Sequence, residues 1–328
     1  MPIPRGWAAA RARQNFYASL RASLGRLGYL EVETPCLVPA PGMEPHISAF
    51  EVPFIPETDV GRPRTLYLHS SPEYAMKRLL ADGAGPLFQI CKVFRNGEVS
   101  RTHNPEFSML EFYRPEADMT AVMADLEAVL AAADVALGAS GFFARTPYER
   151  LTVREAVGRA ADVDLAQCPD ATTLRAAVRR VGVDAPEGES FEDVFFRLFL
   201  SRVEPSLGAS RPTYLTEYPA PMASLARLKP TDASVAERFE LYAHGLELAN
   251  GFSELTDAQE QRRRLLEEQA QRRAAGRAVY PLDEAFLEAV GRLPPSGGVA
   301  VGLDRLLMLF AASEDIAEVL LFPADGFL

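Results

Sequence analysis

The stretch FRNGEVSRTHNPEFSMLEFYRP, residues 94–115, restricts the fold of this chain more than any other. Its second half, residues 107–113, is rich in aromatics and contains neither Gly nor Pro, which predicts a strand. Side chains alternate along a strand, so one face is expected to carry Phe107, Met109, Glu111 and Tyr113. Because an unpaired buried carboxylate is costly, Glu111 must have a partner on that face.

A second strand-like run, residues 87–95, comes just before this stretch and ends at Arg95. The loop of residues 96–106 between the two runs is polar and longer than a tight hairpin requires. Long polar loops in compact domains are often functional. The pattern therefore predicts two strands joined by a functional loop.

The composition is that of a globular protein, with 48% hydrophobic and 24% charged residues in 328. A formal net charge of -11 argues against broad nonspecific binding of nucleic acid. We find neither a signal peptide nor an apolar run of membrane length, which predicts a cytoplasmic protein that binds no membrane. Without a recognisable linker, we expect a single domain over residues 1–328, with a mostly helical insertion around 115–210.

Helices are predicted over residues 7–27, 119–137 and 258–275, the last a charged helix that ends before a glycine. Another helix is expected in SSPEYAMKRLL, where Ser71 can cap the helix, Pro72 takes the first position and Glu73 lies in the first turn.

The stretch SGGVAVGLDRLLMLF, residues 296–310, is predicted to be a short strand followed by a helix from Asp304. Gly302 allows close approach of the backbone, and Arg305 falls in the first turn of the helix. Free N–H groups, the positive end of the helix and an Arg suit a polyanion. A glycine turn before a core helix is also common without any ligand, so both interpretations stay open here.

Residues 236–257, AERFELYAHGLELANGFSELTD, allow two structures. In a hairpin turning at residues 243–244, Glu240 would face Glu247, and facing like charges need a cation between them. Two carboxylates and water are ligands that Mg²⁺ accepts, often together with nucleotide phosphates. In a helix, both glutamates would only be exposed.

Together these motifs resemble the class II aminoacyl-tRNA synthetases. Residues 94–115 look like the second signature motif, residues 297–310 like the third, and GYLEVETPCL like the first, whose proline, here Pro35, belongs to the dimer interface in that class. SPEYAMKRLL, HNPEFSMLEFY and LELANGFSELTD match the lysine-specific branch. The resemblance implies an α+β fold, an antiparallel β-sheet flanked by helices, and a homodimer. It also favours the hairpin over the helix.

Only a short helix precedes the first motif, so we expect no N-terminal anticodon-binding domain. The chain is thus most similar to the elongation factor P–lysine ligase family. This resemblance implies ATP-dependent activation of lysine or (R)-β-lysine and its transfer to a lysine of elongation factor P, without tRNA. Ala300 replaces a Gly of the synthetases' third motif, and Arg101 is displaced from its usual place directly before His-Asn.

The resemblance also implies roles in binding ATP. Arg95 and Arg305 would be the catalytic residues: Arg95 would contact the α-phosphate, and Arg305 would cover the adenine stacked on Phe107. Glu240 and Glu247 would hold Mg²⁺. The remaining expected ATP-binding residues are Asn96, Gly97, Glu98, His103, Asn104, Leu248 and Gly302. Gly97 is a Glu in many relatives, which puts one loop contact in doubt.

For the amino acid, the resemblance implies that Glu73 meets the main amino group, with Ser71, Pro72 and Ala300 nearby. The side-chain ammonium would be surrounded by Glu111, Tyr113 and Glu254. The alternative for Glu111 is an ion pair with a structural cation such as Lys92. Two other functions remain possible: a lysyl-tRNA synthetase-like enzyme that charges tRNA, and a non-catalytic, amino-acid-binding regulatory paralogue.

Overall fold

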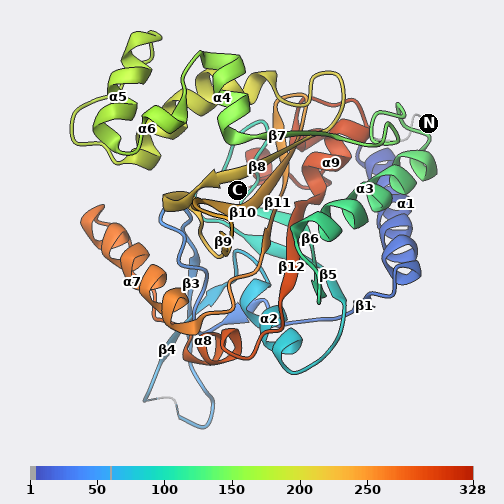
Figure 1. The fold of residues 1–328 in the computed structure, drawn as a ribbon. Helices are drawn as coiled ribbons and strands as arrows, with labels where there is room; N and C mark the ends of the chain where they lie inside the picture. Colours follow the sequence, from blue (N-terminus) through green and yellow to red (C-terminus); the bar gives the residue numbers. More distant parts are fainter. Residues whose placement is uncertain (1–4, 60, 328) are drawn as a thin grey trace.

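A central β-sheet organises the computed structural model, which describes residues 5–59 and 61–327 (Figure 1). Its strands lie in the order β1 (Leu30–Glu31), β5 (Leu87–Phe94), β6 (Glu106–Pro115), β12 (Ser296–Gly302), β11 (Leu246–Ser253), β10 (Asp232–Ala243), β8 (Thr213–Pro219) and β7 (Glu149–Thr152). A short strand, β9 (Leu228–Lys229), pairs with β10. Apart from two parallel pairs, β1 with β5 and β7 with β8, these pairings are antiparallel. The expected α+β class with an antiparallel sheet is confirmed.

The two strands predicted around the long loop pair with each other, with Phe88 opposite Phe112. Strand β6 buries both of its faces, because successive side chains enter different cores. Leu110 and Phe112 belong to one core, whereas Tyr113 belongs to another. The alternation predicted for residues 107–113 is therefore confirmed.

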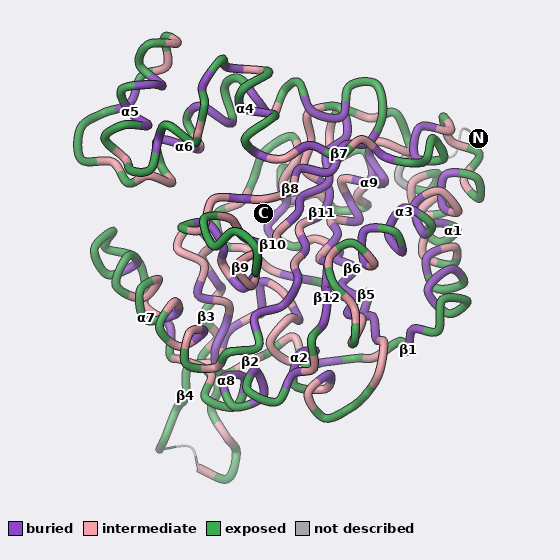
Figure 2. Tube along the Cα trace, viewed as in Figure 1, coloured by how far each residue is buried: buried purple, intermediate pink, exposed green. Residues whose placement is uncertain are grey.

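Three helices pack against one face of the sheet, which we call the first face: α1 (Arg5–Arg26), α3 (Met119–Leu137) and α9 (Leu303–Phe310). The opposite face is the second face. Figure 2 shows that buried residues concentrate in the central strands and on the helix faces turned toward them. The predicted bounds of α3 are correct, since Asp118 caps its first turn and Gly138 ends it in a left-handed conformation.

The second core lies on the side of Tyr113. It is covered by the helices α2 (Glu73–Ala81), α7 (Ala258–Ala274) and α8 (Glu284–Val290), and includes Met76, Leu265 and Phe286. A small antiparallel sheet of β2 (Leu37–Val38), β4 (Arg64–Leu68) and β3 (Phe50–Phe54) adjoins it. Helix α2 begins one residue later than predicted, but the Ser71 hydroxyl still accepts a hydrogen bond from the Glu73 N–H at 3.0 Å.

A third core lies among the helices α4 (Val153–Ala161), α5 (Ala171–Arg180) and α6 (Phe191–Leu198), which extend to one side of the sheet (Figure 1). Helix α4 starts with a capping box between Thr152 and Glu155, and α6 with one between Ser190 and Asp193. That the segment around 115–210 is an insertion into a single domain stays a prediction. In the described part of the chain, we find no helix with the length and apolar content needed to cross a bilayer.

Candidate active site

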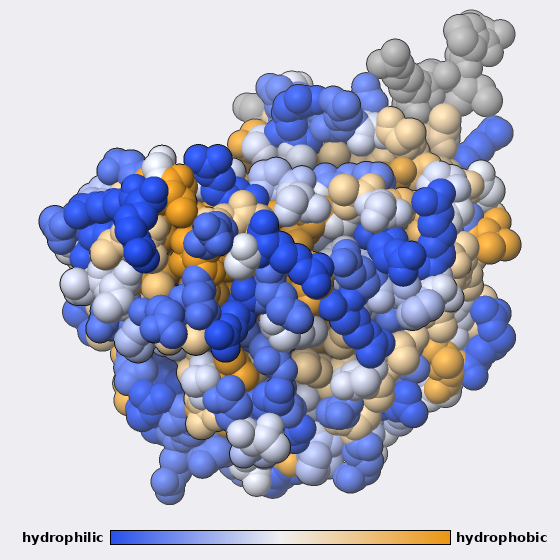
Figure 3. Space-filling view, turned by 45° about the horizontal axis from the view of Figure 1, so that its top comes forward, coloured by the Kyte–Doolittle hydropathy of each residue, from blue (hydrophilic) through white to orange (hydrophobic). Residues whose placement is uncertain are grey.

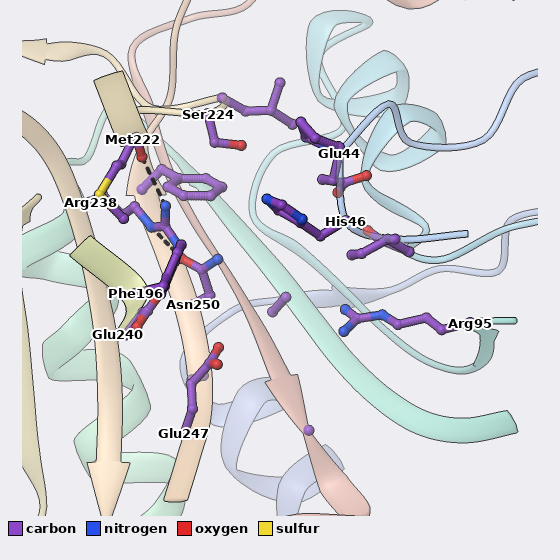
Figure 4. Close-up of a pocket in the computed structure, with 18 of the residues that line it drawn as sticks. Glu44, His46, Arg95, Phe196, Met222, Ser224, Arg238, Glu240, Glu247 and Asn250 are labelled. Carbon is purple, nitrogen blue, oxygen red and sulfur yellow. Dashed lines mark hydrogen bonds and ion pairs between the residues drawn. The ribbon is translucent and has the colours of Figure 1, made fainter. Parts of the chain in front are cut away.

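A cavity of about 710 Å³ opens on the second face of the sheet. Its floor is formed by β6, β10, β11 and β12, and its walls by residues 44–47, the loop of residues 98–104, residues 220–225, α6 and α7. In the close-up, Arg95 lies across the cavity from Arg238 and Glu240, with Glu247 below and Glu44 above (Figure 4). The face of the molecule drawn in Figure 3 is mostly hydrophilic, with hydrophobic patches set between polar ones. A cavity of this size can hold a nucleotide or a similar small molecule.

Arg95 follows β5 and reaches the cavity beside Phe107 of β6. Its guanidinium carbon lies 5.1 Å from the centre of the Phe107 ring, and its nitrogen lies 3.9 Å from the Glu98 carboxylate. The cation that lies over the Phe107 ring in this structure is Arg95. The aromatic ring can stack on a nucleobase, and the guanidinium beside it can pair with a phosphate.

Arg305 lies in the first turn of α9, as predicted, and lines the cavity. Its guanidinium donates to the Glu247 carbonyl at 2.9 Å and contacts His103 Nε2 at 2.6 Å. Burial, followed by the nearby Arg305 charge, lowers the pKa of His103. A neutral His103 can accept the Arg305 hydrogen bond, which holds the loop against α9.

Two buried contacts, which the sequence did not reveal, hold the start of α9. The Asp304 carboxylate accepts a hydrogen bond from the Ser108 N–H at 2.6 Å and pairs with Arg13 of α1 at 2.5 Å. Asp304 is buried, so these contacts satisfy a charge that would otherwise be costly. They fix α9 to β6 and thereby aim Arg305 into the cavity.

The rest of the predicted loop divides into two groups. Glu98, His103 and Asn104 line the cavity, whereas Asn96 and Gly97 are exposed and are not among its lining residues. Asn104 is also structural, because its side-chain oxygen accepts from the Ala324 N–H at 2.9 Å. The loop thus offers fewer side chains to a nucleotide than the resemblance implied.

The segment of residues 236–257 is a hairpin, so the helical alternative is wrong. Its predicted register is also wrong, because the turn lies at His244 and Gly245 rather than at 243–244. Both turn residues have positive φ, 52° and 71°, as a two-residue hairpin turn requires. A bulge follows, so that Glu240 pairs with Asn250 and Glu247 with Tyr242. The two carboxylates still line the same cavity, as diagonal neighbours instead of facing residues.

The environments of these two carboxylates differ. Glu240 pairs with Arg238 at 2.6 Å and accepts hydrogen bonds from the hydroxyls of Tyr218 and Tyr242. The Glu247 carboxylate has no hydrogen bond or ion pair to any described residue. Burial, and then the neighbouring Glu240, raises the pKa of Glu247 to about 7. As a donor set for Mg²⁺, Glu247 fits as it stands, whereas Glu240 would have to give up a protein partner.

A cluster of polar groups lies beside the cavity on the same face of the sheet, where β12 pairs with β6. We call Glu73, Glu111, Tyr113 and Glu254 the acidic cage. In register, Gly298 lies opposite Tyr113 and Ala300 opposite Glu111. Gly298 leaves room for the cage, because a Cβ there would lie 2.4 Å from the Tyr113 ring and 2.5 Å from Glu254 Oε1.

Glu111 is fully buried and accepts hydrogen bonds from the Ser71 hydroxyl and, at 2.9 Å, from the Tyr113 hydroxyl. Burial, and then Glu73, raises the pKa of Glu111 to about 8. The alternative ion pair with Lys92 is wrong, because Lys92 is exposed and lies 3.7 Å from Glu106.

The cation in the cage is Lys77 of α2, which the sequence analysis missed. Its Nζ lies 2.6 Å from Glu73 Oε1 and 2.5 Å from Glu254 Oε2. The spacing of four residues between Glu73 and Lys77 could have suggested the first pair. No local signal pointed to the second.

The structure brings most of the predicted residues to the cavity wall: Ser71, Glu73, Arg95, Glu98, His103, Asn104, Phe107, Glu240, Glu247, Leu248, Ala300, Gly302 and Arg305. Those not on its wall are Pro72, Asn96, Gly97, Glu111, Tyr113 and Glu254. Sequence reasoning also missed Arg238, which donates to the Met222 carbonyl at 2.8 Å and adds a second cation to the wall opposite Arg95 (Figure 4).

Comparisons with known proteins agree with this architecture. The family model described as tRNA synthetases class II (D, K and N) matches residues 6–326. Among similar curated proteins are those named elongation factor P–(R)-beta-lysine ligase from Salmonella paratyphi B, Salmonella schwarzengrund and Salmonella dublin. Each is 41% identical to this chain over 317 residues, which cover 95% of this chain and 94% of the relative.

Proposed function

This chain belongs to the family of class II tRNA synthetases of the D, K and N type, and on that basis we propose that it is an ATP-dependent ligase. It activates (R)-β-lysine or lysine as the aminoacyl-adenylate and transfers it to a lysine side chain of elongation factor P. The observation that carries this proposal is one cavity with cations along its walls and an acidic cage beside it. A triphosphate and a diamino acid need these two opposite environments side by side.

Activation requires little of the protein beyond placement and charge. A carboxylate oxygen of the amino acid attacks the α-phosphorus of ATP, and the bond to the β-phosphate breaks, releasing pyrophosphate. The nucleophile is already an anion, so no general base is needed. We assign Arg95 to neutralising the phosphate charge, and Phe107 and Arg305 to the two faces of the adenine; the Arg305 guanidinium also adds positive charge near the phosphates.

Glu247 would provide the main protein ligand for Mg²⁺, and Glu240 a second one if it releases Arg238 or a tyrosine. The metal would supply charge neutralisation at the phosphates. Arg238 already contributes a fixed positive charge on that wall, independently of any metal.

In the second step, the neutral amine of the acceptor lysine attacks the carbonyl carbon of the adenylate. An amide bond forms, AMP leaves with the bonding electron pair, and the amine loses a proton. The acidic cage holds the ammonium groups of the activated amino acid and keeps its carbonyl in place during both steps. We place this reaction in the cytoplasm, where translation takes place, and expect a homodimer formed through the exposed Pro35 region.

The purified protein should exchange labelled pyrophosphate into ATP in the presence of lysine or (R)-β-lysine. It should then add a mass equal to that residue to elongation factor P, at one lysine located by peptide mass spectrometry. Labelling of tRNA with an unmodified factor would instead establish the synthetase-like alternative. Binding of lysine without any exchange would indicate the regulatory paralogue.

A further inference from the structure

Lys77 is a buried lysine of α2. It is 1% exposed and lies on the face of α2 that also buries Met76 and Leu80. Lysine is almost never fully buried without a partner. Here Nζ lies between two carboxylates, Glu73 on its own helix and Glu254 just after β11.

The carboxylates also hold the charge on Lys77. Burial by itself lowers the pKa of Lys77, but Glu254 and Glu73 more than offset this effect and the pKa is raised overall. Lys77 is therefore an ammonium at neutral pH. One oxygen of each carboxylate is engaged by this ammonium.

The remaining oxygens are differently placed. Glu254 Oε1 is buried and has no hydrogen-bond partner among the described residues. Glu73 lines the cavity, whereas Lys77 does not, so Lys77 contacts the carboxylates from the protein side. Glu254 does not line the cavity, but its ion pair with Lys77 connects it to Glu73, which does. An unpaired buried carboxylate oxygen is the arrangement that an ammonium ligand satisfies.

The Lys77 ammonium also acts on the ionisation of the carboxylates around it. Burial, and then Glu73, raises the pKa of Glu111 to about 8. Burial also raises the pKa of Glu254 to about 7, and the nearby Lys77 charge opposes this rise. Lys77 therefore favours the ionised form of Glu254, which is the form that attracts an ammonium ligand.

We propose that Lys77 is a positioning residue for the amino-acid substrate, because its ammonium orients Glu73 and Glu254 and sets the charge of the acidic cage. This inference rests on the proposed function and deepens it. Under this proposal, the preference for a substrate with two amino groups depends on Lys77 as well as on the carboxylates that contact the substrate.

The test compares Lys77→Met with the wild type and with Lys92→Met, an exposed lysine of β5 that serves as the control. Pyrophosphate exchange gives KM and kcat for lysine and ATP, and isothermal titration measures lysine binding without chemistry. For Lys77→Met we expect the lysine KM to rise at least tenfold and lysine affinity to fall equally, with the ATP KM within twofold of wild type. Lys92→Met should change neither.

An unchanged lysine KM and affinity in folded Lys77→Met overturns the proposal. If Lys77→Met does not fold, the proposal is tested with Lys77→Arg, which keeps the positive charge but moves the hydrogen-bond donors. A rise of at least threefold in the KM for lysine supports the proposal, and an unchanged KM overturns it. A wild type that binds lysine without exchange refutes the proposed function, while the titrations still test Lys77. If the wild type neither binds lysine nor supports pyrophosphate exchange, both the proposed function and the proposed role of Lys77 are refuted.

Discussion

Replacing Gly298 by Ala tests the acidic cage at the point where β12 passes it. The new Cβ would lie 2.4 Å from two carbons of the Tyr113 ring and 2.5 Å from Glu254 Oε1, whereas ordinary contact begins at 3.4 Å. The methyl group is therefore about 1 Å too close to two side chains that are themselves buried. Tyr113 and Glu254 must therefore shift away from the position in which we expect them to hold the ammonium.

Overpacking of this kind costs about 1–3 kcal/mol. If substrate binding requires Tyr113 and Glu254 to return to their original positions, the same free energy is lost from amino-acid affinity. The KM for the amino acid then rises by a factor of roughly 5 to 150. ATP–pyrophosphate exchange measures this rise, with lysine and ATP varied separately. The ATP KM should stay close to wild type, because the phosphate-binding residues Arg95 and Arg305 are not touched.

The neighbouring glycine provides a matched control. A Cβ at Gly297 would point to the opposite face of β12 and lie 2.6 Å from the Asp118 carbonyl oxygen and 2.7 Å from Val122. Gly297→Ala should therefore lower the melting temperature by disturbing the start of α3, without raising the lysine KM of the folded fraction. An unchanged lysine KM in Gly298→Ala, or an equal rise in both variants, would refute the reasoning that places the amino acid beside Tyr113 and Glu254.

Three further predictions concern the two ends of the cavity. Arg305→Ala should reduce the exchange rate by a factor of a hundred or more while circular dichroism shows a folded protein, because it removes a phosphate partner; near-normal exchange contradicts this role. Glu247 binds a cation only when it is ionised and its pKa is raised to about 7, so the affinity for Mg²⁺–ATP should increase between pH 6 and pH 8. Isothermal titration should show that Glu247→Gln lacks this increase. If the variant keeps the same pH dependence, Glu247 is not the metal ligand. Glu254→Gln should weaken lysine binding at least tenfold with little change in ATP binding, and equal weakening of both ligands would instead indicate a structural role for Glu254.

The sequence by itself determined the fold class and most of the elements. The alternation along residues 107–113 placed Glu111 and Tyr113 on one face, because the period of a strand is two wherever the strand lies. Helix α3 was predicted with its observed bounds, and the caps that the structure shows at Asp118 and Gly138 are formed by residues local to the helix. The order of the motifs pointed to the family that the comparisons then showed.

Only the tertiary structure decided the register of the hairpin and the partners of the carboxylates. The hairpin turns one residue later than predicted, at His244 and Gly245, which places Glu247 opposite Tyr242 instead of Glu240, and Arg238 together with Tyr218 engages Glu240. Lys77 reaches Glu254 from a helix far away in sequence. Periodicity gives the face on which a side chain lies, but its partner depends on which distant strands and helices pack against that face. The charge of this site was therefore settled by long-range packing, which no local pattern encodes.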